Sequence, residues 1–302
     1  MPRFGSVITA MVTPFRADGS IDLDMAGTLA RYLASSGSDG LVLAGSTGEG
    51  SVLTDEERID LFRAVAEAVD VPVIASTGTN DTAHSVLMTE RARSVGVDGI
   101  LAVTPYYNRP SPAGLSAHFR AIAEASDLPV VLYDIPVRSG RRIGADLTLE
   151  LAREVPTIVG VKDATGDVAA AAEVVAACPD GFEVYCGDDS LTLPFASIGA
   201  VGIISVAAHW AGRQFGEMIG RYRAGDVEGA ARVNQHLAES YRFESSEEFP
   251  NPVPAKAACR ALGLAVGQCR LPNAPAPSAL EERAHAVMSR LNQHEPMHQT
   301  VV

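Results

Sequence analysis

The chemistry that this sequence could perform begins with its lysines. Of the 24 basic residues in the 302-residue chain, only Lys162 and Lys256 are lysines, and the rest are arginines. Arginine stays protonated in proteins, whereas lysine can lose its proton and act as a nucleophile. Lys162 ends the apolar run Ile158–Lys162, and an apolar interior favours the neutral amine. The run therefore predicts an imine-forming lysine; the alternative is a lysine paired with Asp163 or Asp188.

A second reactive segment is the glycine-rich stretch Gly45–Gly50, which follows another apolar run. The hydroxyls of Ser46 and Thr47, together with backbone N–H groups, suit a small carboxylate. No Lys-Ser/Thr pair follows, so a phosphate-binding loop for ATP is excluded. The alternative is a tight turn between a strand and a helix.

Two more side chains could act on a substrate. Tyr133 falls at the end of an apolar run, where a phenol can shuttle a proton. Arg138 follows in the next loop and could bind a carboxylate through two parallel hydrogen bonds. The alternatives are a packed core tyrosine and a solvated arginine, and Arg141 and Arg142 resemble the second case.

Eight short apolar runs position these residues. Each is apolar nearly throughout, as parallel strands buried on both faces are, and each is followed by an Ala- and charge-rich helical stretch. Eight such units predict an α/β fold, a (β/α)8 TIM barrel, whose chemistry lies at the C-terminal ends of the strands. A doubly wound open sheet is the alternative. The runs are Val7–Met11, Leu41–Ala44, Val73–Ser76, Gly99–Val103, Val130–Tyr133, Ile158–Lys162, Glu183–Cys186 and Ile203–Val206.

The pattern changes after Val206, where successive helices follow without a strand between them. The expected helices are Gln214–Ala224, Val227–Arg242, Pro254–Leu262 and Ser278–Leu291. The sequence therefore predicts a barrel over residues 1–224, a helical C-terminal extension over 225–292 and a disordered tail over 293–302. Two helix starts are also predicted, a capping box at Thr54 and an N-cap at Asp22.

Composition limits the partners. The net charge of −13 argues against nucleic acid or an anionic membrane surface, although it permits a small anionic substrate. The four cysteines are scattered, which indicates reduced thiols and neither a disulfide framework nor a zinc site. No signal peptide and no membrane span are apparent, so we expect a cytoplasmic protein.

Together these segments resemble the family of pyruvate-dependent lyases and synthases that includes dihydrodipicolinate synthase and N-acetylneuraminate lyase. The resemblance runs from about Gly5 to Pro272 and rests on five motifs in order. They are Gly45–Glu49, Val103–Pro110, Leu132–Pro136, Gly160–Gly166 and Gly187–Asp189.

The resemblance implies that Lys162 forms an imine with pyruvate, whose carboxylate is held by Thr47 and the loop amides. The backbone at Gly187 and Ile204 would shape the pocket. No metal or organic cofactor is implied, because the lysine iminium is itself the electron sink.

The resemblance also implies a proton relay shared between subunits. Tyr133 would be the shuttle, and Tyr107 would reach across a dimer interface into the neighbouring site. Ser46 would supply the hydroxyl that links the two tyrosines, a position where threonine is usual in the synthases. The expected assembly is a homotetramer, arranged as a dimer of dimers.

The second substrate divides the family. Arg138 lies where the synthases bind the carboxylate of aspartate semialdehyde, and Asn251–Lys256 resembles their C-terminal pattern, with Lys256 structural. We therefore expect condensation of pyruvate with L-aspartate 4-semialdehyde to 4-hydroxy-tetrahydrodipicolinate, in lysine and diaminopimelate biosynthesis. One alternative is an aldolase or lyase of sugar acids, of the N-acetylneuraminate or 2-keto-3-deoxygluconate type, which shares Gly45–Glu49. Another is a non-catalytic barrel that binds a 2-oxo acid.

Many synthases of this family are inhibited by lysine near the dimer interface. The resembling positions are Asn80, His84 and Tyr106, with Asp55 and Arg58 on the helix that opens at Thr54. His84 replaces an acidic residue that would hold the ammonium group of the inhibitor. The resemblance therefore predicts weak or absent inhibition by lysine.

Overall fold

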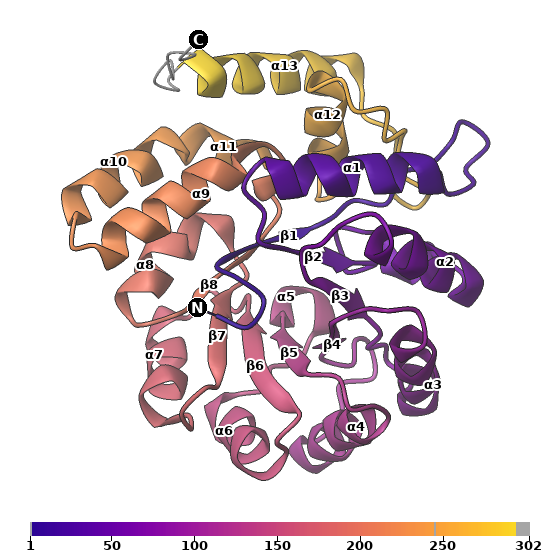
Figure 1. Cartoon of the computed structure of the whole chain (residues 1–302), viewed down its shortest axis with the longest axis vertical. Coiled ribbons are helices and arrows are strands. Elements are labelled where there is room, and N and C mark those ends of the chain that lie inside the picture. The colour runs from indigo at the N-terminus through magenta and orange to yellow at the C-terminus, as the bar shows by residue number, and fades with distance from the viewer. Residues whose placement is uncertain (1, 245, 294–302) are drawn as a thin grey trace.

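The chain forms a closed barrel of eight parallel strands surrounded by helices (Figure 1). The computed structural model describes residues 2–244 and 246–293. The strands are β1 (Val7–Ala10), β2 (Gly40–Leu43), β3 (Val73–Ser76), β4 (Gly99–Val103), β5 (Val130–Asp134), β6 (Ile158–Asp163), β7 (Glu183–Cys186) and β8 (Gly202–Ser205). Strands adjacent in sequence pair in the barrel, and β8 closes it by pairing with β1. Each bound lies within one residue of its predicted run, so the predicted (β/α)8 barrel is confirmed and the open sheet is wrong.

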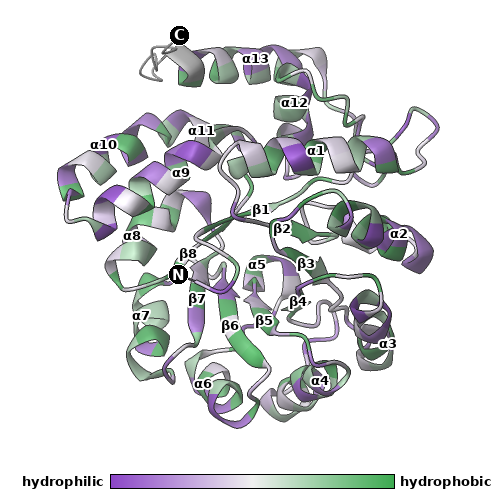
Figure 2. Cartoon of the chain, viewed as in Figure 1, coloured by the Kyte–Doolittle hydropathy of each residue, from purple (hydrophilic) through white to green (hydrophobic). Residues whose placement is uncertain are grey.

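Both faces of the strands are buried, which explains their nearly continuous apolar sequences. Residues such as Ile8 and Val42 belong to an apolar cluster inside the barrel. Their neighbours Val7 and Leu41 pack outside it, under the helices. Figure 2 shows hydrophobic residues on strands β5 and β6. A polar side chain on the inner face can therefore reach water only near a barrel end.

Helical segments fill the connections between the strands up to β8. They are α1 (Leu23–Ser35), α2 (Asp55–Ala66), α3 (Thr82–Arg93), α4 (Pro112–Glu124), α5 (Pro136–Ser139), α6 (Ala145–Glu154), α7 (Val168–Ala177) and α8 (Thr192–Ser197), with short 3₁₀ turns η1 (Gly50–Val52) and η2 (Asp189–Leu191). Both predicted caps are confirmed. The Asp22 carboxylate accepts from the Met25 amide, and Thr54 and Glu57 form a reciprocal capping box.

Helix α9 (Ala208–Arg223) begins well before the predicted start at Gln214, so that prediction was wrong. The Asp189 carboxylate, from the loop after β7, accepts from the amides of Val206 (2.9 Å) and Ala207 (3.1 Å). A kink at Ala211 separates this first turn from the remainder of the helix. A distant loop therefore holds the chain just before the helix, whereas the first helical amide, that of Ala208, donates to the nearby Ser205 hydroxyl.

Four helices follow, namely α10 (Val227–His236), α11 (Ala238–Glu244), α12 (Val253–Ala261) and α13 (Ser278–Gln293). The prediction of a single helix over Val227–Arg242 is wrong, because α10 ends at His236 and α11 begins at Ala238. Trp210 donates to Ser240 Oγ (2.6 Å), and its ring meets Phe243 edge-on. The break allows Leu237, Ser240 and Phe243 all to be buried.

Helices α12 and α13 pack against each other, and α12 also packs on α9 (Figure 1). Helix α13 reaches Gln293, which is the first residue of the predicted tail. The remainder of that tail, 294–302, lies outside the described residues. The division into a barrel (1–224) and an extension (225–292) stays a prediction.

Further features of the described residues concern membrane-spanning helices, metal sites and disulfides. No helix within residues 2–244 and 246–293 is long and apolar enough to cross a membrane. In the same part of the chain, no three His, Cys, Asp or Glu side chains gather where they could hold a metal ion. The cysteines Cys178, Cys186, Cys259 and Cys269 are free thiols.

Candidate active site

Lys162 lies on the inner face of the barrel, near the C-terminal end of β6. Its register neighbours are Tyr133 on β5 and Tyr185 on β7. The lysine is 5% exposed, and its Nζ lies 4.3 Å from the centre of the Tyr133 ring. A buried amine beside a phenol, at the catalytic end of a barrel, suits a nucleophile with an adjacent proton carrier.

The two carboxylates offered as alternative partners of Lys162 bind elsewhere. Asp163 accepts from the amide and hydroxyl of Thr165 (2.8 and 2.7 Å), and Asp188 accepts from Ser190. Both carboxylates therefore order their own loops. The interpretation of Lys162 as one half of an ion pair loses its support.

Other sequence-predicted residues lie close to this amine. A Cβ placed on Gly187 would come within 3.1 Å of Lys162 Cε and 2.8 Å of Ala164 Cβ, so glycine permits the approach. Ile204 belongs to the same interior cluster as Tyr133 and Tyr185. Burial and the neighbouring Glu183, to which its hydroxyl donates at 2.8 Å, raise the pKa of Tyr185. The surroundings of Lys162 are therefore mostly apolar, with Tyr185 kept neutral.

The loop after β2 is tightly folded around Thr47. Thr47 is 4% exposed, and its Oγ1 accepts from Asn251 Nδ2 at 3.0 Å. The next carbonyl, that of Gly48, accepts from Thr13 Oγ1 at 2.6 Å. A Cβ on Gly50 would lie 1.9 Å from the carbonyl oxygen of Ala44, so only glycine fits there. The loop thus holds Thr47 in one conformation.

Lys256, on α12, anchors the same loop from the other side. It is fully buried, and its Nζ lies 2.6 Å from Glu49 Oε1 and 3.0 Å from the carbonyl oxygen of Gln268. Burial lowers the pKa of Lys256, while the Glu49 carboxylate acts in the opposite direction. The ammonium also lies over the Phe15 ring. Lys256 is therefore structural, as expected.

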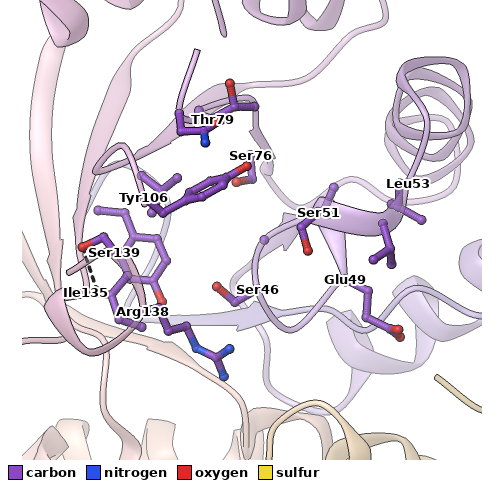
Figure 3. A pocket seen from close by; sticks show the side chains of 18 of the residues that line it. Ser46, Glu49, Ser51, Leu53, Ser76, Thr79, Tyr106, Ile135, Arg138 and Ser139 are labelled. Atoms are coloured by element: carbon purple, nitrogen blue, oxygen red, sulfur yellow. Dashed lines mark hydrogen bonds between the residues drawn. The ribbon is translucent and has the colours of Figure 1, made fainter. Parts of the chain in front are cut away.

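Arg138 lies on the short helix α5, exposed at the mouth of the barrel. Its Nη2 donates to the backbone oxygen of Asn251 at 3.3 Å. Figure 3 shows Ser46 and the Arg138 guanidinium reaching toward the same region, whereas Glu49 turns away from them. The guanidinium keeps further donors with which to bind a carboxylate.

Ser46, Tyr133 and Arg138 line a cavity of about 600 Å³, whereas Lys162, Thr47, Gly187 and Ile204 are not among its lining residues. The positions of the inhibitor site, Asn80, His84 and Tyr106, line the same cavity. The sequence therefore predicted two groups of residues that the fold places around one continuous space.

His84 is bound within the protein. Its Nε2 lies 2.8 Å from Asp55 Oδ1. Arg58 is buried and donates to the backbone oxygen of Ser76, and burial lowers the pKa of this guanidinium. The predicted ammonium-binding position therefore holds a histidine that already has a carboxylate partner.

Tyr107 does not line this cavity in its own chain. Its side chain is 91% exposed, and its backbone has a positive φ of 74°. A strained, exposed aromatic residue is costly for an isolated chain, and such residues gather at functional sites and interfaces. The exposure agrees with a contact to a second subunit, which stays a prediction.

The role of Asn251 was missed by reasoning from the sequence. In the sequence, Asn251–Lys256 is recognisable only as the C-terminal pattern of the synthases, with a structural role for Lys256. The structure places Asn251 between Thr47 and Arg138. A conspicuous Asn-Pro-Val-Pro stretch was the only signal available.

The closed barrel, with a buried lysine–tyrosine pair near the strand ends, is typical of α/β-barrel enzymes. The profile of the Dihydrodipicolinate synthetase family matches residues 3–293, and the chain belongs to this family. A 4-hydroxy-tetrahydrodipicolinate synthase of Moorella thermoacetica is 49% identical over 290 residues, covering 95% of this chain and 98% of the relative. The synthase of Bacillus subtilis is 44% identical, covering 90% and 94%.

Comparison with solved structures points to the same family. The dihydrodipicolinate synthase of Bacillus anthracis superimposes with a TM-score of 0.92 at 43% identity, covering 98% of this chain and 100% of that one. The enzyme of Cyanidioschyzon merolae, solved with lysine bound, gives 0.93 at 40% identity, covering 97% and 99%. The chain is thus a lyase of this family, and the synthase branch predicted from the sequence is confirmed. The sugar-acid and non-catalytic alternatives are not favoured.

Proposed function

We propose that the chain condenses pyruvate with L-aspartate 4-semialdehyde to 4-hydroxy-tetrahydrodipicolinate through an imine on Lys162. The observation that carries this proposal is the buried Lys162 amine, 4.3 Å from the centre of the Tyr133 ring on the adjacent strand. Relatives with this synthase name match nearly the whole chain.

In the first step the Lys162 amine adds to the C2 carbonyl of pyruvate, and water leaves. Loss of a proton from C3 then gives an enamine, with the positively charged nitrogen as the electron sink. Tyr133, on the adjacent strand, carries protons in these steps. Thr47 and the amides of its loop hold the carboxylate, while Gly187 and Ile204 shape the pocket around the imine.

In the second step the enamine C3 attacks the aldehyde carbon, and the new alkoxide takes up a proton. Arg138 binds the carboxylate of the semialdehyde through parallel charge-assisted hydrogen bonds. The amino group of this substrate then attacks C2, closes the ring and releases Lys162. This step explains why an amino-aldehyde, unlike a sugar aldehyde, yields a heterocycle.

The proposal includes an assembly and a cellular location. Tyr107 completes the relay with Ser46 and Tyr133 in the site of a neighbouring subunit, in a homotetramer built as a dimer of dimers. The exposed Tyr107 side chain supports this arrangement. Biosynthetic chemistry on small metabolites and free cysteine thiols support a cytoplasmic location.

Borohydride trapping tests the mechanism. Incubation with pyruvate and borohydride should attach a reduced pyruvyl group to Lys162, as peptide mass spectrometry would show. Lys256 is the internal control, because its amine is buried against Glu49 and should stay unmodified. An adduct on Lys256, or no adduct at all, would contradict the mechanism.

A further inference from the structure

Asn251 contacts both proposed substrate-binding side chains at once. Its Nδ2 donates to Thr47 Oγ1 at 3.0 Å, and its backbone oxygen accepts from Arg138 Nη2 at 3.3 Å. It lies in the segment between α11 and α12 and lines the cavity that contains Ser46 and Tyr133. Asn251 therefore links Thr47, proposed to bind the carboxylate of pyruvate, to Arg138, proposed to bind the carboxylate of the semialdehyde.

The contact with Thr47 determines which way the hydroxyl can act. A hydroxyl group has one hydrogen to donate and two lone pairs. The amide of Asn251 takes up one lone pair, so the hydrogen of Thr47 stays available for another acceptor. Thr47 is 4% exposed, so water competes little for that hydrogen. A bound carboxylate then receives a hydroxyl already oriented to donate, without a reorientation cost.

The segment that carries Asn251 is itself held against the Thr47 loop. Lys256, one turn into α12, forms the buried ion pair with Glu49, two residues after Thr47. Two contacts therefore join the same two segments, one between Asn251 and Thr47 and one between Lys256 and Glu49. This second contact holds the two segments together beside the hydrogen bond between Asn251 and Thr47.

We infer that Asn251 is a positioning residue that orients the Thr47 hydroxyl toward the carboxylate of pyruvate through its side chain. Its backbone oxygen holds Arg138 independently of the side chain. The inference rests on the proposed function, in which Thr47 binds pyruvate. Its specific consequence is that changes to the side chain affect pyruvate and leave the semialdehyde nearly unaffected.

The informative variant is Asn251→Asp. It retains the backbone oxygen and the shape of the side chain, but it replaces the donor with an acceptor. The carboxylate would accept the Thr47 hydrogen and repel the carboxylate of pyruvate. We expect KM for pyruvate to rise about tenfold or more, while KM for the semialdehyde changes less than about twofold. Reduced pyruvyl-Lys162 should still form at saturating pyruvate.

Asn273→Asp is the matched control, because Asn273 lines the same cavity and has no hydrogen bond to Thr47 among the described contacts. It should leave KM for pyruvate within about twofold of the wild type, since charge at a distance is screened. Thr47→Val should raise KM for pyruvate as well. The double variant Asn251→Asp/Thr47→Val should show less than the sum of the two effects, because both remove one interaction.

Several outcomes would overturn the inference. They are an unchanged KM for pyruvate in Asn251→Asp, an equal rise in Asn273→Asp, additive effects in the double variant, or an equal rise in KM for both substrates. If Asn251→Asp does not fold, Asn251→Ala removes the donor without adding charge and should raise KM for pyruvate about threefold. Absence of any wild-type adduct on Lys162 would instead refute the proposed mechanism itself.

Discussion

Lys256 and Glu49 form a fully buried ion pair, with Nζ and Oε1 2.6 Å apart. The second carboxylate oxygen of Glu49 accepts from the backbone amide of Arg270 at 2.9 Å. The pair therefore joins the Thr47 loop to the C-terminal segment. The only two lysines of the chain are thus both buried, one with a carboxylate partner and the other, Lys162, beside a phenol.

Lys256→Met should destabilise the protein by about 3–5 kcal/mol, because it leaves Glu49 buried without its cation. The free energy of unfolding in urea would measure this. Adding Glu49→Gln should recover part of the loss. Lys162→Met is the matched control; it should abolish activity and keep or raise stability, since it removes a buried polar group. Equal stability losses in both lysine variants would contradict the assignment.

Arg138→Ala should lower kcat/KM for aspartate semialdehyde at least about a hundredfold, equal to about 2.7 kcal/mol. The pyruvate adduct on Lys162 should persist, because the proposed function assigns Arg138 to the second substrate. Steady-state kinetics with each substrate varied would show the split. Arg142→Ala, which removes a surface ion pair with Asp167, is the control. Unchanged turnover in Arg138→Ala, or faster reaction with a sugar aldehyde, would return the sugar-acid alternative.

Tyr107→Phe and Lys162→Met should each be nearly inactive alone, yet a mixture should regain activity after subunit exchange. In a mixed dimer, one site has an intact Lys162 and receives Tyr107 from its neighbour. Random exchange predicts about a quarter of wild-type activity, from one working site in each mixed dimer. Mass spectrometry of intact assemblies would confirm the exchange. No recovery in verified mixed dimers, or a fully active monomer, would show that Tyr107 acts within its own chain.

Lysine should inhibit weakly or not at all. The position expected to bind its ammonium is occupied by His84, whose ring is already bound to Asp55, and the nearby Arg58 adds positive charge. His84→Glu should increase sensitivity to lysine, because it supplies a carboxylate, whereas His84→Gln should not. Inhibition curves and thermal shift would measure this. Tight lysine binding to the wild type at millimolar concentration or below would contradict the prediction.

His209 should make the free energy of unfolding depend on pH. Its Nε2 accepts from the Val12 amide and its Nδ1 donates to the Val206 carbonyl, so only the neutral ring fits. Burial lowers the pKa of His209 from 6.5 to about 4. Below pH 6.5 the unfolded chain therefore binds this proton first, and stability is lost as the pH falls toward 4.

Urea unfolding at pH 8 and pH 5 would test this effect. His209→Gln should be less stable than the wild type at pH 8, and the difference should shrink by about 2 kcal/mol at pH 5. His285→Gln, which changes an exposed histidine, should follow the wild type at both values. A constant difference between His209→Gln and the wild type would contradict the burial effect.

The sequence alone determined the barrel and indicated candidate residues for its active site. A parallel strand buried on both faces must be apolar throughout, so eight such runs are visible locally. Because chemistry in a barrel lies at the strand ends, Lys162 and Tyr133 could be named as candidate site residues without coordinates. The start of α2 was equally clear, since Thr54 and Glu57 satisfy each other within one turn.

Only the tertiary structure decided which distant groups meet. Asn251 and Thr47 lie 204 positions apart, and nothing near either residue specifies the other as its partner. Asp189 accepts from the two amides before α9 from another loop, a contact that the sequence near that helix does not show. The periodicity of a sequence indicates whether a side chain is buried, but it does not indicate which other side chain it contacts. The contact partner is decided only when the whole barrel closes.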